Sequence, residues 1–199
     1  MAHAKLSPSS AERWMNCPGS VVLSEGMPNQ TSVFAEEGTK AHEIAEMILR
    51  NQKGWADAPV EMLEHIKVYV DYVNDLALFD GDLHIEQRVK VYEVVFGTAV
   101  AVVWRPQLEE LHIIDLKYGA GVAVEVVNNL QLKIYALATL LTFEYPAKTV
   151  TATIVQPRCY HPDGHIRSVV YDVVDLMDFY ADVSDAIQHV KEATDAYSA

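Results

Sequence analysis

The chain is poor in cysteine and has no long hydrophobic run. Its 199 residues include two cysteines, Cys17 and Cys159, which are far apart and form no C-x-x-C pair. This spacing argues against a zinc ribbon and against a scaffold stapled by disulfides. No apolar run reaches the roughly 18 to 20 residues that span a bilayer. The N-terminus precedes no apolar signal core, so the sequence predicts a cytoplasmic protein without a membrane segment.

Basic residues are also scarce. There are 15 basic and 28 acidic residues, which give a formal net charge of −13. This charge opposes the binding of polyanions at long range and lowers the expectation of tight, unspecific nucleic-acid binding, although a local basic groove stays open. The hydrophobic share of 50% is ordinary for a globular protein. The length suits one domain over residues 1–199 with a buried core.

The hydrophobic pattern predicts an α/β fold with a mixed central β-sheet flanked by helices. Amphipathic spacing dominates the beginning of the chain, whereas β-branched runs dominate its middle. A short helix over 10–16 is expected to turn Trp14 and Cys17 inward. The expected parts are an N-terminal helical part over 1–80, a sheet core over 83–174 with a helix over 128–143, and a C-terminal helix over 175–199.

One strand of a predicted hairpin carries two opposite charges. Two apolar, β-branched runs, 96–103 and 111–119, are joined by polar residues and are typical of a hairpin. A period of two places Ile113, Asp115 and Lys117 on one face of the second run. The pair is either a surface salt bridge at a strand end or part of a metal site. In the second case Asp115 is an oxygen ligand for Mg²⁺, and Lys117 stabilises a phosphate or orients water.

The strand predicted over 83–91 shows regular alternation. The two expected faces are Ile85, Gln87, Val89 and Val91 on one side and Glu86, Arg88 and Lys90 on the other.

Several other polar residues could take part in a site. His42 lies on the border of the apolar stripe of an amphipathic helix, where a histidine is more often structural or exposed than a ligand. Gln131 and Tyr135 are one turn apart on a strongly apolar helix. His161 and His165 flank a predicted turn and are expected to be solvated rather than to form a metal pair.

Five short motifs occur in order between residues 6 and 157. They are Leu6–Ser10 with Cys17-Pro18, Glu37-Gly38-Thr39 with His42, Gly97-Thr98-Ala99, Asp115-Leu116-Lys117-Tyr118-Gly119, and Gln131 with Tyr135. Together they resemble the RecB-like branch of the PD-(D/E)XK nucleases, and more narrowly its uncharacterised phage and prophage members. Five ordered motifs are much more specific than any one of them.

The resemblance implies a restriction-endonuclease-like core and a metal-dependent DNA nuclease. The activity would be phosphodiester hydrolysis of the exonuclease type, with Mg²⁺ or Mn²⁺ as cofactor, in phage DNA processing or recombination. The implied partners are DNA and a phage recombination protein. By analogy with phage exonucleases, the resemblance is also compatible with the assembly of several copies into a ring.

The resemblance also assigns a role to each matching residue. His42 and Asp115 would be metal ligands, with the carbonyl oxygen of Leu116 as a further ligand. Lys117 would handle the attacking water.

Two other sets of residues would complete the site in this resemblance. Gln131 and Tyr135 would belong to the catalytic site and line its DNA-binding side. Glu86 falls where related exonucleases carry a supporting acid, which is a weaker correspondence.

Val100 departs from the family pattern. The strand that follows Gly-Thr-Ala normally continues with the first metal-binding aspartate, and Val100 offers no oxygen ligand. Activity would then require a substituting acid, for which Glu37, Glu86 and Glu125 are candidates. Relatives also bind an iron–sulfur cluster through four cysteines, which the two cysteines of this chain cannot supply.

Two other interpretations compete with the nuclease. The first is a catalytically silent module with a nuclease fold that binds DNA or a protein partner. The second sets the resemblance aside and predicts a small acidic α/β domain in which Asp115 and Lys117 merely pair. In that case His42, Gln131 and Tyr135 would lie far from Asp115.

Overall fold

The computed structural model describes residues 4–27, 33–52, 54–55 and 58–198. Within them, five strands form one sheet in the order β1-β2-β3-β4-β5. Neighbouring strands are antiparallel except β3 and β4, which are parallel, so the sheet is mixed as predicted. The strands are β1 (Asp82–Tyr92), β2 (Val95–Arg105), β3 (Glu110–Leu116), β4 (Thr149–Val155) and β5 (Ile166–Asp172).

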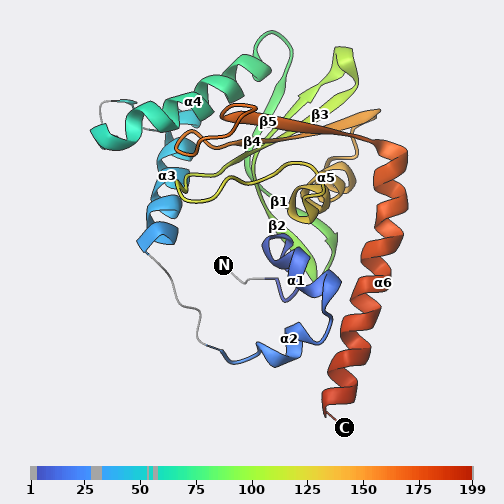
Figure 1. Ribbon diagram of the computed structural model, residues 1–199. Helices are drawn as coiled ribbons and strands as arrows, with labels where there is room; N and C mark the ends of the chain where they lie inside the picture. The colour runs from blue at the N-terminus through green and yellow to red at the C-terminus, as the bar shows by residue number, and fades with distance from the viewer. Residues whose placement is uncertain (1–3, 28–32, 53, 56–57, 199) are drawn as a thin grey trace.

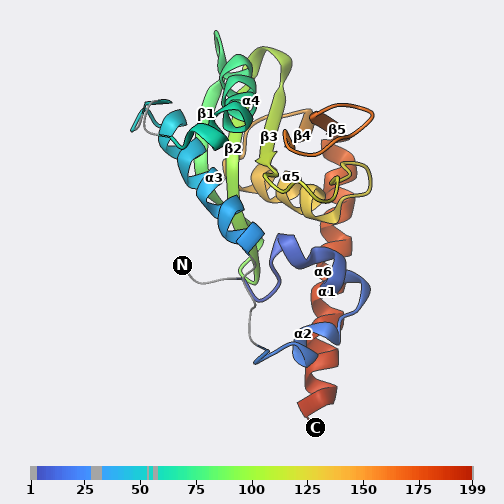
Figure 2. The same ribbon diagram turned by 60° about the vertical axis from the view of Figure 1, so that its left-hand side comes forward.

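Helices cover both faces of the sheet (Figures 1 and 2). They are α1 (Ala11–Asn16), α2 (Ser20–Leu23), α3 (Val33–Leu49), α4 (Val60–Ala77), α5 (Leu130–Phe143) and α6 (Val173–Ser198). The mixed α/β architecture flanked by helices is thus confirmed. The short helix α2 lies in the segment 18–32, part of which, 28–32, lies outside the described residues. In the described part of the chain, no helix combines the length and apolarity needed to cross a membrane.

Two large hydrophobic cores occupy the two faces of the sheet. The first joins the sheet to α1, α2, α5 and α6, and the second joins it to α3 and α4. The two cores share no buried residue. Side chains of β3 alternate between them, with Ile113 in the first core and Ile114 in the second. This is the side-chain period of two that a regular strand produces.

The predicted alternation of β1 is wrong at Glu86. Ile85 packs against the second core, whereas Val89 belongs to the first, although the two are four positions apart and should share a face of a regular strand. The reason is that Glu86 adopts a left-handed backbone conformation with φ of 52°. One such residue inside a strand shifts the alternation of the residues that follow. Glu86 therefore does not share a face with Arg88 and Lys90 in the manner of a uniform strand.

The neighbouring strand changes phase at the same place. Ala99 is buried in the first core and Ala101 in the second. In a regular strand, residues that are two positions apart would lie on the same face. The register pairs Ile85 with Ala101 and Gln87 with Ala99, which leaves Glu86 opposite Val100. A left-handed conformation is unfavourable for a residue with a β-carbon, by about 1 to 2 kcal/mol. Such strain concentrates at functional sites, and here it lies opposite Val100.

The N-terminal segment is anchored by Trp14. Its side chain is fully buried in the first core, as expected, and its indole Nε1 donates a hydrogen bond to the Ser7 carbonyl oxygen at 3.0 Å. Cys17, in contrast, is exposed, so the prediction that it points inward is wrong. Cys17 is the residue after the last turn of α1, where the backbone has left the helical conformation. The helical period therefore no longer sets the direction of its side chain.

Candidate functional site

Two adjoining cavities lie beside Glu86 and Val100, where the side-chain alternation of β1 and β2 changes. One has a volume of about 860 Å³ and the other of about 210 Å³. His42, Val100 and Lys117 line both. Glu86 lines the larger cavity, while Asp115 lines the smaller one. Residues from α3, β1, β2, β3 and the start of α5 thus meet in one region.

Asp115 and Lys117 form a largely buried ion pair. Lys117 Nζ lies 2.8 Å from Asp115 Oδ2, and the two side chains are only 25% and 13% exposed. The pair is therefore not a surface salt bridge. The contact has the distance of an ion pair but not the orientation of a hydrogen bond, and Asp115 Oδ2 accepts none from the described residues. Lys117 Nζ also donates to Gln131 Oε1 at 3.5 Å, a long hydrogen bond to the first turn of α5.

His42 lies on α3 and approaches the Asp115–Lys117 pair from the face of the sheet opposite to α5. Burial lowers the pKa of His42 below its usual value, and the Lys117 charge lowers it further. The Asp115 charge and a hydrogen bond with the Leu116 backbone act in the other direction. The net result is a neutral imidazole near neutral pH, which is the form that binds metal ions.

Glu86 is the carboxylate that the strand break brings toward Asp115. Burial raises the pKa of Glu86 to about 7, with a further upward contribution from Glu46 and a smaller one from Asp115, while Arg50 opposes them. Because Ala101 pairs with Ile114, extending that register by one residue places Val100 opposite Asp115. Val100 therefore lies between the two acids, with Glu86 opposite it on β1 and Asp115 opposite it on β3.

Gln131 and Tyr135 lie one turn apart on α5. The helix begins where Asn129 Oδ1 accepts a hydrogen bond from the Leu132 backbone at 3.0 Å, which caps its N-terminus. Burial raises the pKa of Tyr135 to about 12, and the charges of Asp115 and Glu86 contribute to this rise. The hydroxyl of Tyr135 is therefore a hydrogen-bond donor at any physiological pH.

Gly97 makes room for Tyr135. A β-carbon at position 97 would lie 2.7 Å from Tyr135 Oη and 2.9 Å from Cε1. Atoms of real side chains do not approach this closely, so residue 97 must be glycine for the ring to rest on β2. The glycine of the Gly-Thr-Ala motif thus has a steric explanation in this chain.

We expect Gly97→Ala to destabilise the protein by about 1 to 3 kcal/mol, because the added methyl group must displace the Tyr135 ring. Urea unfolding of Gly97→Ala, Tyr135→Ala and the double variant measures the coupling. In the Tyr135→Ala background the cost of Gly97→Ala should vanish. An equal cost in both backgrounds would show that the methyl group clashes with something other than the ring.

The other candidate acids are engaged elsewhere. Glu37 Oε2 lies 2.8 Å from Arg158 Nη1 in an ion pair. Glu125 is 68% exposed and lies 3.2 Å from the ring of His161. The His161 side chain is only 8% exposed, so the prediction that it is solvated is wrong, whereas His165 is exposed as expected. Of the three candidates, Glu86 is the acid whose charge, together with that of Asp115, raises the pKa of Tyr69 and of Tyr135.

Tyr69 on α4 is a site neighbour that the sequence did not reveal. Its side chain is fully buried, and its hydroxyl has no hydrogen-bond partner among the described residues. Burial raises its pKa, and the charges of Asp115 and Glu86 add to the rise. Tyr69 lies beside the apolar stripe of α4, which made it look like an ordinary core residue.

The donor types suit Mg²⁺ or Mn²⁺, but they do not form a ready cluster. Among the residues that the structure describes, no three histidine, cysteine, aspartate or glutamate side chains are grouped to hold a metal ion. Instead the Lys117 ammonium lies against Asp115 Oδ2. That oxygen accepts no hydrogen bond from the described residues, and the Lys117 ammonium is its charged neighbour. A cation could use it once Lys117 moves aside.

Comparison with known proteins gives a family. A solved structure described as "Crystal structure of SSO0001" is 14% identical to this chain, covers 89% of it and 85% of its own length, and has a TM-score of 0.34. This similarity is too distant to add to the description above. A family model described as "Protein of unknown function (DUF2800)" matches residues 3–198. The chain therefore belongs to the DUF2800 family.

Proposed function

We propose that the protein is a metal-dependent nuclease with a restriction-endonuclease-like core, which hydrolyses phosphodiester bonds in DNA. The observation that carries the proposal is the position of Glu86, held in a left-handed conformation opposite Val100. There it supplies a carboxylate next to the position at which the resembling nucleases have an aspartate. The motif resemblance supports DNA as the substrate and phage DNA processing or recombination as the setting.

His42, Asp115, Glu86 and the carbonyl oxygen of Leu116 are the groups that would hold the cation. A bound divalent cation supplies a Lewis acid that polarises the phosphate and lowers the pKa of a bound water. The two carboxylates compensate the charge of a divalent ion, and neutral His42 contributes a nitrogen ligand.

The remaining residues act on the phosphate. Lys117, once displaced from Asp115, is a free ammonium beside the phosphate and stabilises the negative charge of the transition state. Lys117 also donates a long hydrogen bond to Gln131 Oε1 on α5, at 3.5 Å. Tyr135 keeps its proton because its pKa is about 12, so it can donate a hydrogen bond to a phosphate oxygen.

A specific observation favours a second candidate function. Lys117 already neutralises Asp115, and no metal cluster is assembled among the described residues. A catalytically silent module with a nuclease fold, binding DNA or a protein partner, would have these features. The net charge of −13 favours a protein partner over DNA in that case.

Calorimetric titration with Mn²⁺ and Mg²⁺, with degradation of linear DNA followed in parallel, tests the proposal. We expect the unaltered chain to bind the ion and degrade DNA. Asp115→Asn keeps the shape of the side chain but removes its charge, and we expect it to lose both properties while circular dichroism stays native. An unaltered chain that neither binds the ion nor cuts DNA would favour the silent module.

A further inference from the structure

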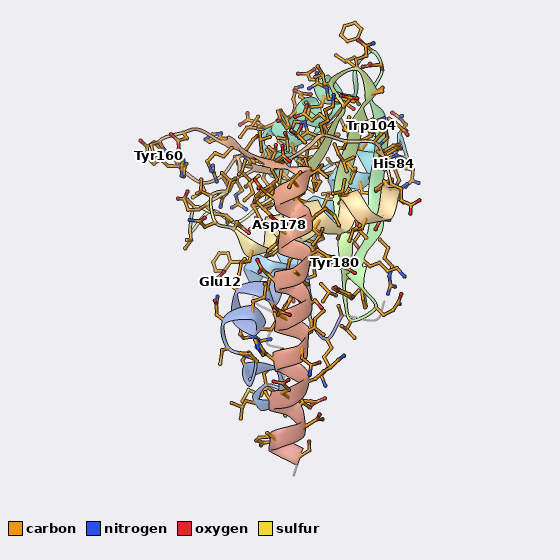
Figure 3. All side chains as sticks on the ribbon, turned by 90° about the vertical axis from the view of Figure 1, so that its right-hand side faces the viewer. Glu12, His84, Trp104, Tyr160, Asp178 and Tyr180 are labelled. Carbon is orange, nitrogen blue, oxygen red and sulfur yellow. The ribbon has the colours of Figure 1, made fainter. Side chains whose placement is uncertain are left out.

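Arg158 is held at the rim of the larger cavity by two contacts. It lies in the loop between β4 and β5, which projects from the body of the molecule with Tyr160 near its tip (Figure 3). Arg158 Nη1 is 2.8 Å from Glu37 Oε2 on the first turns of α3. Its guanidinium carbon lies 4.5 Å from the centre of the Tyr118 ring. The contacts join this loop to α3 and to the segment after β3.

The neighbours of Arg158 belong to the cavity. Tyr118 and Gln156 line it, and so does Gly38, which follows Glu37. Lys117 is the one lysine or arginine among the lining residues that the structure describes. A nucleic-acid strand carries one phosphate per nucleotide, so a strand held by Lys117 at one phosphate leaves the next without a cation from the cavity wall. Arg167 also contacts lining residues, but it is only 5% exposed and its guanidinium donates to Val124 and Gln156. Arg158, whose side chain is 25% exposed, is the more accessible of the two.

The present partner of Arg158 can be exchanged easily. Its side chain is 25% exposed and that of Glu37 is 39% exposed, and an ion pair with this much exposure adds little stability. A guanidinium binds phosphate through two parallel hydrogen bonds, which a carboxylate partner mimics. The stacking on Tyr118 is independent of Glu37, so it keeps the guanidinium at the rim after the exchange.

We propose that Arg158 is a second phosphate-binding residue, which releases Glu37 and binds the nucleic-acid phosphate adjacent to the one at Lys117. In this arrangement Glu37 is an internal competitor of the substrate. The cavity volume of about 860 Å³ is in the range of pockets for single ligands, which favours a single-stranded end over a duplex. The inference rests on the proposed function.

The test measures binding of a fluorescently labelled, short single-stranded DNA oligonucleotide to the full chain in EDTA, over a range of salt concentrations. Arg158→Gln should weaken binding about tenfold and reduce the slope of log K against log salt by about 0.7, the value for one phosphate contact on a single strand. Glu37→Gln should strengthen binding, because the competing carboxylate is gone. In the double variant the gain from Glu37→Gln should disappear.

Lys67→Gln is the matched control, because Lys67 forms an exposed ion pair with Asp71 on α4 and removing it changes the net charge equally. It should leave the salt slope unchanged. The inference is overturned if Arg158→Gln leaves the slope unchanged, if Glu37→Gln fails to strengthen binding, or if the unaltered chain does not bind the oligonucleotide. DNA cleavage with an unchanged slope would refute this inference alone. A slope that depends on Arg158, without cleavage in Mg²⁺ or Mn²⁺, would refute the nuclease alone.

Discussion

Glu86→Gln is expected to reduce Mn²⁺ affinity and DNA hydrolysis by about 100-fold or more, and the addition of Val100→Asp is expected to restore most of both. The reason is the register of the sheet, in which Val100 has Glu86 opposite it on β1 and Asp115 opposite it on β3. A carboxylate on either strand then reaches the same region beside Asp115. Glutamine preserves the size of the glutamate side chain, so the loss reports the charge.

Four proteins complete this experiment: the unaltered chain, each single variant and the double variant. Calorimetry with Mn²⁺ and degradation of linear DNA provide independent measurements. Full activity in Glu86→Gln would show that Glu86 is not the substituting acid. Activity in the Val100→Asp single variant, with none in the unaltered chain, would show that this chain is the silent form of a nuclease.

Trp14→Ala is expected to lower the free energy of unfolding by about 3 to 5 kcal/mol. The side chain is fully buried among residues of the first core and ties α1 to it. A loss of this size is a large part of the roughly 5 to 15 kcal/mol by which domains are stable. Chemical denaturation followed by circular dichroism measures it.

Trp14→Phe is the control for the aromatic ring itself. It keeps most of the apolar volume but loses the indole donor to the Ser7 carbonyl oxygen. That oxygen also accepts hydrogen bonds from the backbone and side chain of Ser10, so it keeps partners and the cost should be about 1 kcal/mol. Equal losses in the two variants would mean that the hydrogen bond, and not the packing, anchors the N-terminal segment.

The order of the helices and strands could be predicted because the hydrophobic period of a long segment indicates whether it is a helix or a strand. The hairpin of β2 and β3, the shared face of Asp115 and Lys117, and the one-turn spacing of Gln131 and Tyr135 all follow from local periods. The structure brings these residues together with His42, so the interpretation in which they lie far apart does not hold. The assignment as a nuclease still depends on the motif resemblance.

The position of Glu86 could not be predicted, for a physical reason. Alternation along a strand assumes an extended backbone, and left-handed residues are usually signalled by glycine or asparagine. Residue 86 is neither, so β1 looked regular. Arg158 was missed because its partners, Glu37 and Tyr118, are remote in sequence and meet only in the folded chain.

The separation of the two hydrophobic cores has a thermodynamic consequence. The core under α3 and α4 shares no buried residue with the core on the other face. His42 lies on α3, whereas Gln131 and Tyr135 lie on α5 on the opposite face of the sheet. A ligand bound between His42 and α5 therefore acts as a crosslink between two halves that are otherwise joined through the sheet. Such a ligand raises the free energy of unfolding, and the increase grows with the logarithm of the ratio of its concentration to its dissociation constant. Occupancy of the site and cohesion of the two layers are thus one linked equilibrium.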